Sequence, residues 1–157
     1  MYIDEKSVSA MLKTVSIAGI EEQGVPFKEE NTSLDEATKH VSIGNLTWIE
    51  CVVDDIATET PKILEKLKIN MDSSTLLSGY LTEYEDVGDT LGLMVPFIFT
   101  GENRTQTSPC LIFLKKDLIV TIHDDYGGKI TKLYTYSSSI MRKLPQTPET
   151  WADIQTL

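Results

Sequence analysis

The stretch from Ser108 to His123, SPCLIFLKKDLIVTIH, decides the fold of this chain. Cys110 to Leu114 is a continuous apolar run, and Leu118 to Ile122 is a second run that is rich in β-branched residues. The polar residues 115–117, KKD, separate the two runs. Two apolar runs around a short polar break predict a β-hairpin. Because neither run alternates with polar residues, we expect a hairpin buried on both faces, in the middle of a sheet that helices cover.

The length and composition of the chain are typical of one globular domain. Its 157 residues include 41% hydrophobic and 24% charged residues, so it can bury a sizeable core. The formal net charge of -10 argues against a nucleic acid or an anionic membrane surface as the partner. This charge fits a surface that faces cations, and it also fits plain solubility.

The two cysteines, Cys51 and Cys110, lie inside apolar strand-like runs. We expect free, buried thiols, which are typical of an intracellular protein. The first residues show no signal-peptide pattern. The longest apolar run, Leu91 to Phe99, is about half the length that a membrane helix needs. The chain as given is therefore not expected to span a membrane.

Strand and helix signals alternate along the rest of the chain. Besides the hairpin, the expected strands are residues 12–20 and 25–29, both at a sheet edge, and 46–53, 80–86 and 90–99. The expected helices are 34–41, 60–68, 73–78, 129–143 and a last helix from Thr147. The first follows a capping box that begins at Ser33, the second has Pro61 at its first position, and the third follows the N-cap Asp72. Residues 101–108 are expected to form an exposed loop. Residues 1–146 then make a single α/β domain, and 147–157 begin a truncated helix, as in a fragment of a longer protein.

Residue types that carry catalysis are few in this sequence. His40 and His123 are the only histidines, and His123 ends an apolar strand, where a hydrogen-bonded structural role is expected. Two histidines and two cysteines at wide spacing do not form a zinc set. Gly127-Gly128-Lys129 lacks the upstream glycine of a phosphate-binding loop, and no nucleophile elbow is present. We therefore expect no enzymatic activity.

Three acidic pairs are the remaining candidates for chemistry: Asp54-Asp55, Glu85-Asp86 and Asp124-Asp125. Hard cations such as Mg²⁺ bind carboxylate oxygens and keep most of their water, so each pair can supply one or two ligands. None of the pairs has the spacing of a calcium-binding loop. Solvated surface charge is the alternative interpretation of each pair.

The elements from Thr47 onward follow a distinctive order. Thr47-Trp48-Ile49 opens a strand, a helix ends in Lys68-Ile69, and a short helix, a tyrosine-bearing strand and a long apolar strand come next. The hairpin LIFLKKDLIVTIH closes the series. This order, over about two-thirds of the chain, resembles the cytoplasmic amino-terminal domain of CorA-type magnesium transporters.

The resemblance implies a fold, a partner and a role. The fold is an α/β/α sandwich around a central sheet of mixed parallel and antiparallel strands. The domain leads into a stalk helix, whose start Thr147 to Leu157 fits, and then into two membrane helices that are absent here. The partner is the chain itself, in a homopentamer, and the membrane is reached only through the missing C-terminal part. The role is that of a cytoplasmic regulatory domain of a cell-membrane protein, which senses intracellular divalent cations (magnesium, with cobalt or nickel as further cargoes) and gates the pore.

The resemblance leaves the metal site unassigned. The acidic pair that family members carry in the short helix falls on Thr75-Leu76, and the Leu76 side chain cannot ligate magnesium. The family's Arg-Pro-Lys before the tyrosine strand is replaced by Leu81-Thr82-Glu83. The acids nearby in the sequence are Asp72, Glu83, Glu85 and Asp86. Magnesium is thus a possible ligand that the fold does not require, and the alternative is a free-standing soluble α/β interaction module with no metal role.

Overall fold

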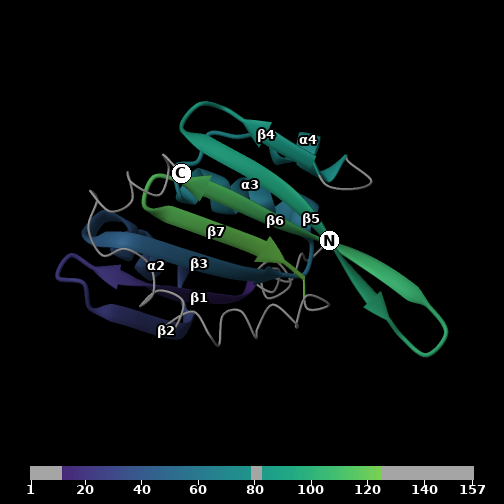
Figure 1. Ribbon diagram of the computed structural model, residues 1–157, viewed down its shortest axis with the longest axis horizontal. Helices are drawn as coiled ribbons and strands as arrows, with labels where there is room; N and C mark the ends of the chain where they lie inside the picture. Colours follow the sequence, from purple (N-terminus) through teal and green to yellow (C-terminus); the bar gives the residue numbers. More distant parts are fainter. Residues whose placement is uncertain (1–11, 79–82, 125–157) are drawn as a thin grey trace, which may run out of the picture.

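A seven-stranded sheet forms the centre of the protein, in a computed structural model that describes residues 12–78 and 83–124 (Figure 1). The strand order is β2-β1-β3-β7-β6-β5-β4. The strands are β1 (Leu12–Glu21), β2 (Pro26–Thr32), β3 (Gly44–Val53), β4 (Glu83–Asp86), β5 (Thr90–Thr100), β6 (Thr105–Lys115) and β7 (Leu118–His123). The described helices are α2 (Leu34–Ile43), α3 (Ile56–Lys66) and α4 (Ser73–Leu77). Strands β3 and β7 pair in parallel and the other neighbours are antiparallel, so the predicted α/β class with a mixed sheet is confirmed.

The predicted hairpin is confirmed as the middle of this sheet. Strands β6 and β7 pair from Lys115 and Leu118 onward, and only residues 116 and 117 connect them. Asp117 has a φ of 61°, a left-handed conformation that aspartate tolerates. The Asp117 carbonyl also accepts a hydrogen bond of 2.9 Å from the backbone N–H of Thr47. The hairpin turn is therefore joined to β3, the next strand in the sheet.

Helices α2, α3 and α4 lie on the same side of the sheet (Figure 1). Their apolar side chains and the facing strand residues form the main core, in which Ile63 and Leu64 of α3 meet fully buried residues of β3, β6 and β7. On the opposite face, Ile20 and Leu46 form a smaller cluster with Trp48 and Ile119. The helices that would complete the predicted α/β/α sandwich, at 129–143 and 147–157, lie outside the described residues, as does the expected boundary at residue 146.

The start of α3 differs from the prediction. The helix begins at Ile56, because the Asp55 carboxylate accepts from the backbone N–H of Thr58 at 3.3 Å and caps it one turn early. Pro61 thus lies inside the helix and not at its first position. A proline there removes one helical hydrogen bond, a cost that the burial of the following apolar residues offsets. The prediction that the helix runs from 60 to 68 was wrong at both ends.

The end of α3 is a Schellman motif. The backbone N–H of Lys68 donates to the Glu65 carbonyl at 3.1 Å, and that of Ile69 donates to the Leu64 carbonyl at 2.8 Å. Lys68 has a φ of 56°, the position where glycine is usual. The chain therefore turns sharply after Lys66 and leads into the short helix α4.

Strand β1 is interior, although an edge strand was expected. It pairs with both β2 and β3, and among the described strands β2 is the edge on this side of the sheet. Gly19 permits this packing, because a Cβ at this position would overlap the Leu46 carbonyl oxygen and the ring of Phe27. The edge prediction for residues 25–29 is confirmed by β2.

The expected loop at residues 101–108 is strand in its second half. Thr105 to Ser108 belong to β6 and pair with residues 97–100 of β5. Strand β7 pairs with β6 only from Leu111, so the ends of β5 and β6 extend past the sheet as a two-stranded arm (Figure 1). Pairing with β5 overrides the polar composition that indicated a loop, since threonine favours the extended backbone.

Candidate functional site

Leu76, at the position of the family's acidic pair, belongs to the core. It lies in α4 with an exposed fraction of 0%, while its neighbour Thr75 is exposed. A Cβ on Gly92 of β5 would come within 2.9 Å of the Leu76 Cδ1 atom, which shows how closely α4 packs on the sheet. This position therefore serves packing and offers no oxygen to a cation.

Asp72 is the acid nearest to this helix in the sequence, and it is exposed. It caps α4: its Oδ1 atom accepts from the backbone N–H of Ser74 at 2.9 Å and from the Ser74 hydroxyl at 2.7 Å. These two hydrogen bonds hold the pKa of Asp72 below its usual value, so the carboxylate stays ionised. With residues of α3 and α4 it lines a shallow, open groove of about 350 Å³ (Ala57, Pro61, Ser73, Ser74, Leu77 and Ser78).

The other suggested acids lie on β4. Glu85 is opposite Gly92, which places it on the face that α4 covers. Its Oε2 atom is buried and has no hydrogen-bond partner among the residues that the structure describes. The Asp86 carboxylate instead accepts from the backbone N–H of Gly88 at 2.9 Å and stabilises the turn to β5. Glu83 is opposite Met94.

These acids do not converge on one point. Within residues 12–78 and 83–124, no group of three or more His, Cys, Asp or Glu side chains is arranged to hold a metal ion. Asp72 and Glu85 flank the same helix, α4, but one faces solvent and the other is partly covered. The arrangement provides separate carboxylates near α4 and no complete metal site in this part of the chain.

The remaining acidic pairs have structural contacts. Asp54 forms an ion pair with Lys13 at 2.9 Å, and Asp55 caps α3. Asp124 accepts a hydrogen bond of 2.7 Å from the Ser108 hydroxyl, which joins the end of β7 to β6. Asp125 and the run 127–129 lie outside the described residues.

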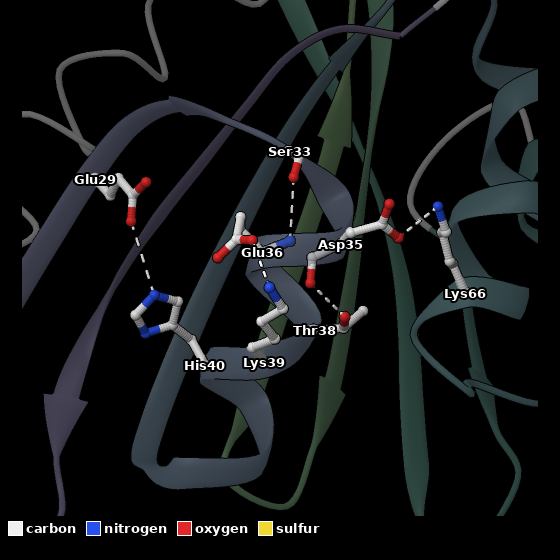
Figure 2. A network of polar contacts seen from close by, with 8 residues as sticks. All are labelled: Glu29, Ser33, Asp35, Glu36, Thr38, Lys39, His40 and Lys66. Carbon is white, nitrogen blue, oxygen red and sulfur yellow. Dashed lines mark hydrogen bonds and ion pairs between the residues drawn. The ribbon is translucent and has the colours of Figure 1, made fainter.

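His40 belongs to a surface network around α2 (Figure 2). Its ring stacks on Phe27 of β2, with centroids 4.8 Å apart, and its Nε2 atom lies 3.7 Å from the Glu29 carboxylate. On the other side of α2, Lys66 of α3 forms an ion pair of 2.7 Å with Asp35. The network attaches α2 to the edge strand β2 and to α3. Its role is therefore structural.

His123 has a different environment, buried on the sheet face opposite the helices. Its Nε2 atom lies 2.9 Å from Glu50 Oε1, and its Nδ1 atom lies 2.7 Å from the Asp124 carbonyl oxygen. Burial works to lower the pKa of His123, but the hydrogen bonds and negative charges of Glu50 and Asp124 outweigh it and raise the pKa above its usual value. The predicted hydrogen bonding of this histidine is confirmed, whereas Glu50 was not singled out. Its one sequence signal is that it is the only charged residue in the run LTWIECVV.

A second polar contact crosses the same two strands. The indole N–H of Trp48 donates to the Thr121 hydroxyl at 3.1 Å. Since β3 and β7 are the parallel pair of the sheet, Trp48 and Glu50 lie on one face with Thr121 and His123. These contacts join residues 73 positions apart in the chain, so they help to set the register of the central strands.

The sheet and its helices define an α/β domain in which one parallel pair lies between two antiparallel wings. Among the described residues, no helix is long and apolar enough to cross a membrane. No protein-family model and no curated protein sequence matches the chain.

The fold is similar to that of the soluble domain of CorA from Methanocaldococcus jannaschii, with a TM-score of 0.53 and 21% sequence identity over 83% of this chain and 48% of that one. The cytoplasmic domain of ZntB from Vibrio parahaemolyticus RIMD 2210633 matches with a TM-score of 0.48 and 12% identity, over 91% of this chain and 55% of that one. The chain spans about half the length of these two structures. The expected resemblance to a CorA-like domain is confirmed in the fold.

Proposed function

We propose that this chain is the cytoplasmic domain of a CorA-like divalent-cation transporter and that it regulates the pore in response to intracellular metal. The observation that carries this proposal is the shared fold with the CorA soluble domain over 83% of the chain. In this proposal the domain acts in a homopentamer, reaches the membrane only through chain that follows it, and has no enzymatic activity. Magnesium is the first cation to test, with cobalt and nickel as alternatives.

The electrostatics of the chain support a role near cations. A net charge of -10 creates a negative potential that raises the local concentration of divalent ions. The residues at the family's metal position nevertheless do not fit a metal, because the Leu76 side chain is apolar and fully buried. A cation that contacts this region has to use other oxygens, and Asp72 and Glu85 are the acids that flank α4. In this proposal the apolar core holds the fold, and magnesium is a regulatory ligand that the fold does not need.

A magnesium titration tests the regulatory role. The thermal midpoint of the 157-residue chain is measured with increasing MgCl₂ up to the millimolar range. A ligand that binds only the native state raises the midpoint by mass action. We expect a rise that the double variant Asp72→Asn, Glu85→Gln removes and that the matched control Asp54→Asn retains, since Asp54 contacts Lys13. A wild-type midpoint that does not respond to Mg²⁺, Co²⁺ or Ni²⁺ would contradict metal sensing by this domain.

Sedimentation and the parent reading frame test the assembly. Without stalk contacts, we expect this chain to be monomeric or weakly associated, with and without millimolar magnesium, and a stable pentamer of this chain alone would contradict that expectation. The reading frame beyond Leu157 is expected to encode an amphipathic helix and two apolar spans of about 20 residues. A stop codon directly after Leu157 would refute the transporter assignment.

The second candidate is a free-standing interaction module with the same fold. It is favoured by Leu76 in the core and by the lack of a metal-holding group within the described residues. Exposed apolar side chains, such as Ile98 on the arm and Tyr84 on β4, supply it with a contact surface. This candidate predicts a self-sufficient monomer that does not respond to divalent cations. The magnesium titration and the reading frame beyond Leu157 therefore distinguish it from the transporter domain.

A further inference from the structure

The buried pair Glu50 and His123 joins β3 to the end of β7, on the sheet face away from α2, α3 and α4. The exposed fractions are 6% for Glu50 and 2% for His123. Buried ionisable groups are costly unless they are paired and hydrogen-bonded, so this contact constrains which protonation states the native fold can hold. The distances from the two ring nitrogens of His123 to their partners identify the protonation state of the pair.

The hydrogen-bond partners of the ring determine the number of protons in the pair. The Asp124 carbonyl oxygen, 2.7 Å from Nδ1, can only accept, so Nδ1 carries a hydrogen. Nε2 then faces Glu50 Oε1 at 2.9 Å. Either a protonated Nε2 donates to the carboxylate, or a protonated carboxyl donates to Nε2. Both arrangements place one proton between the two atoms, and without it two lone pairs face each other in a buried site.

We propose that Glu50 and His123 form a proton-binding latch, which joins β3 to the end of β7 while it holds one proton and opens when that proton leaves. At the end of β7, the Asp124 carboxylate also contacts the Ser108 hydroxyl of β6 at 2.7 Å. Loss of the proton therefore weakens the side-chain contacts at the end of β7. The proposal does not rest on the transporter function.

The neighbouring groups favour retention of the proton. On β6, burial and the charge of Glu50 raise the pKa of the Cys110 thiol to about 12, so Cys110 is neutral in the relevant pH range. After β7, the Asp124 carboxylate adds a negative charge beside the ring. On β1, the residue opposite Glu50 is Ser16, which has no charge. The described elements around the pair thus contribute negative charge, which supports an imidazole pKa above its ordinary value.

The sign of the pH dependence follows from this raised pKa. Below about pH 6.5, the unfolded and native states both hold the histidine proton, and the full contribution of the pair to stability is present. Above about pH 6.5, the unfolded chain releases a proton that the native pair keeps. The folding equilibrium constant then falls by up to about tenfold per pH unit, until the pH passes the native pKa of His123.

A variant that keeps the hydrogen bond and removes the need for the proton tests the latch. In Glu50→Gln, the amide N–H₂ donates to an unprotonated Nε2, while Nδ1 still donates to the Asp124 carbonyl. Urea unfolding of the 157-residue chain is measured from about pH 6.5 to about pH 8, where most cysteine thiols of the unfolded chain are still protonated. We expect the wild-type folding constant to fall across this range and the Glu50→Gln constant to stay level. The matched control is Glu59→Gln, since Glu59 is also buried but pairs with Lys62 at 2.8 Å, and it should retain the wild-type slope.

Imidazole ¹⁵N spectra give an independent test that needs no folded Glu50 variant. The sequence has two histidines, so His40→Gln assigns the ring signals. We expect the His123 ring to titrate above the ordinary histidine value. The latch is overturned if His123 titrates at or below the ordinary histidine value, or if wild type and Glu50→Gln lose stability with the same slope.

Discussion

Replacing Leu76 by aspartate would place a carboxyl group at the position where the family carries its acids. In this fold the substitution is expected to destabilise the domain and not to create a metal site. Leu76 has an exposed fraction of 0% and packs on β5 beside Gly92, in contact with the main core. The helix that carries it is five residues long and depends on this contact for its position.

The magnitude follows from two effects. Removing the buried leucine side chain costs about 2–5 kcal/mol through lost burial and the cavity that remains. An unpaired carboxyl group in the core costs roughly 1–3 kcal/mol more, and it stays protonated because an isolated buried charge is costlier still. The expected loss is roughly 3–8 kcal/mol, which is much of the stability of a domain of this size.

Urea unfolding of the 157-residue chain measures this loss as a lower midpoint at constant slope. Thr75→Asp is the matched control, since Thr75 is exposed on the same helix and should change stability by about 0.5 kcal/mol or less. The measurement is repeated with millimolar MgCl₂. The reasoning is refuted if Leu76→Asp lies within about 1 kcal/mol of wild type, or if magnesium restores its stability selectively.

Three further outcomes are expected. Gly92→Ala should lower the free energy of unfolding in urea by about 1–3 kcal/mol, because the new Cβ would overlap the sulfur of Met71. Gly101→Ala is the control and should be nearly neutral, since there is space around its Cβ. Equal effects of the two substitutions would argue against close packing of α4 on β5. Asp55→Ala should cost about 1 kcal/mol through loss of the α3 cap, and Asp55→Asn should restore most of it, so a neutral Asp55→Ala would place the start of the helix elsewhere. Burial raises the pKa of the Cys51 and Cys110 thiols to about 12, so both should stay protonated at mildly alkaline pH. We expect them to react with iodoacetamide only after urea unfolds the chain. Fast alkylation of the native protein would contradict their burial.

The best-predicted elements have signals contained within a few residues. The backbone N–H of Glu36 donates to the Ser33 hydroxyl at 3.1 Å, as the capping-box sequence predicts, and Asp72 caps α4 as expected. Gly88, where φ is 92°, forms the turn between the expected strands 80–86 and 90–99. In each case the hydrogen bond or the backbone conformation joins residues at most three positions apart, so the local sequence is sufficient.

The errors arose where a distant contact outweighed the local signal. Thr60-Pro61 is a good helix start in isolation. The packing of α3 on the sheet stabilises one more turn before it, and Asp55 caps that turn. The polar residues 105–108 are strand because β5 lies beside them. The candidate acids were chosen by their distance from Leu76 along the chain, and this criterion did not show that Glu85 is partly covered and that Asp86 stabilises a turn.

Local sequence determines that this protein has a buried hairpin at residues 110–122, because apolar runs and a short polar turn encode it directly. It does not determine that β7 lies parallel to β3, because that choice depends on which strands the whole chain brings together. The pairing of Glu50 with His123, 73 positions away, depends on the same choice. The core position of Leu76 likewise depends on how α4 packs against β5. Short-range hydrogen bonds and backbone preferences are thus readable along the chain. The packing that decides the burial of Leu76 and the pairing of Glu50 with His123 exists only in the folded sheet.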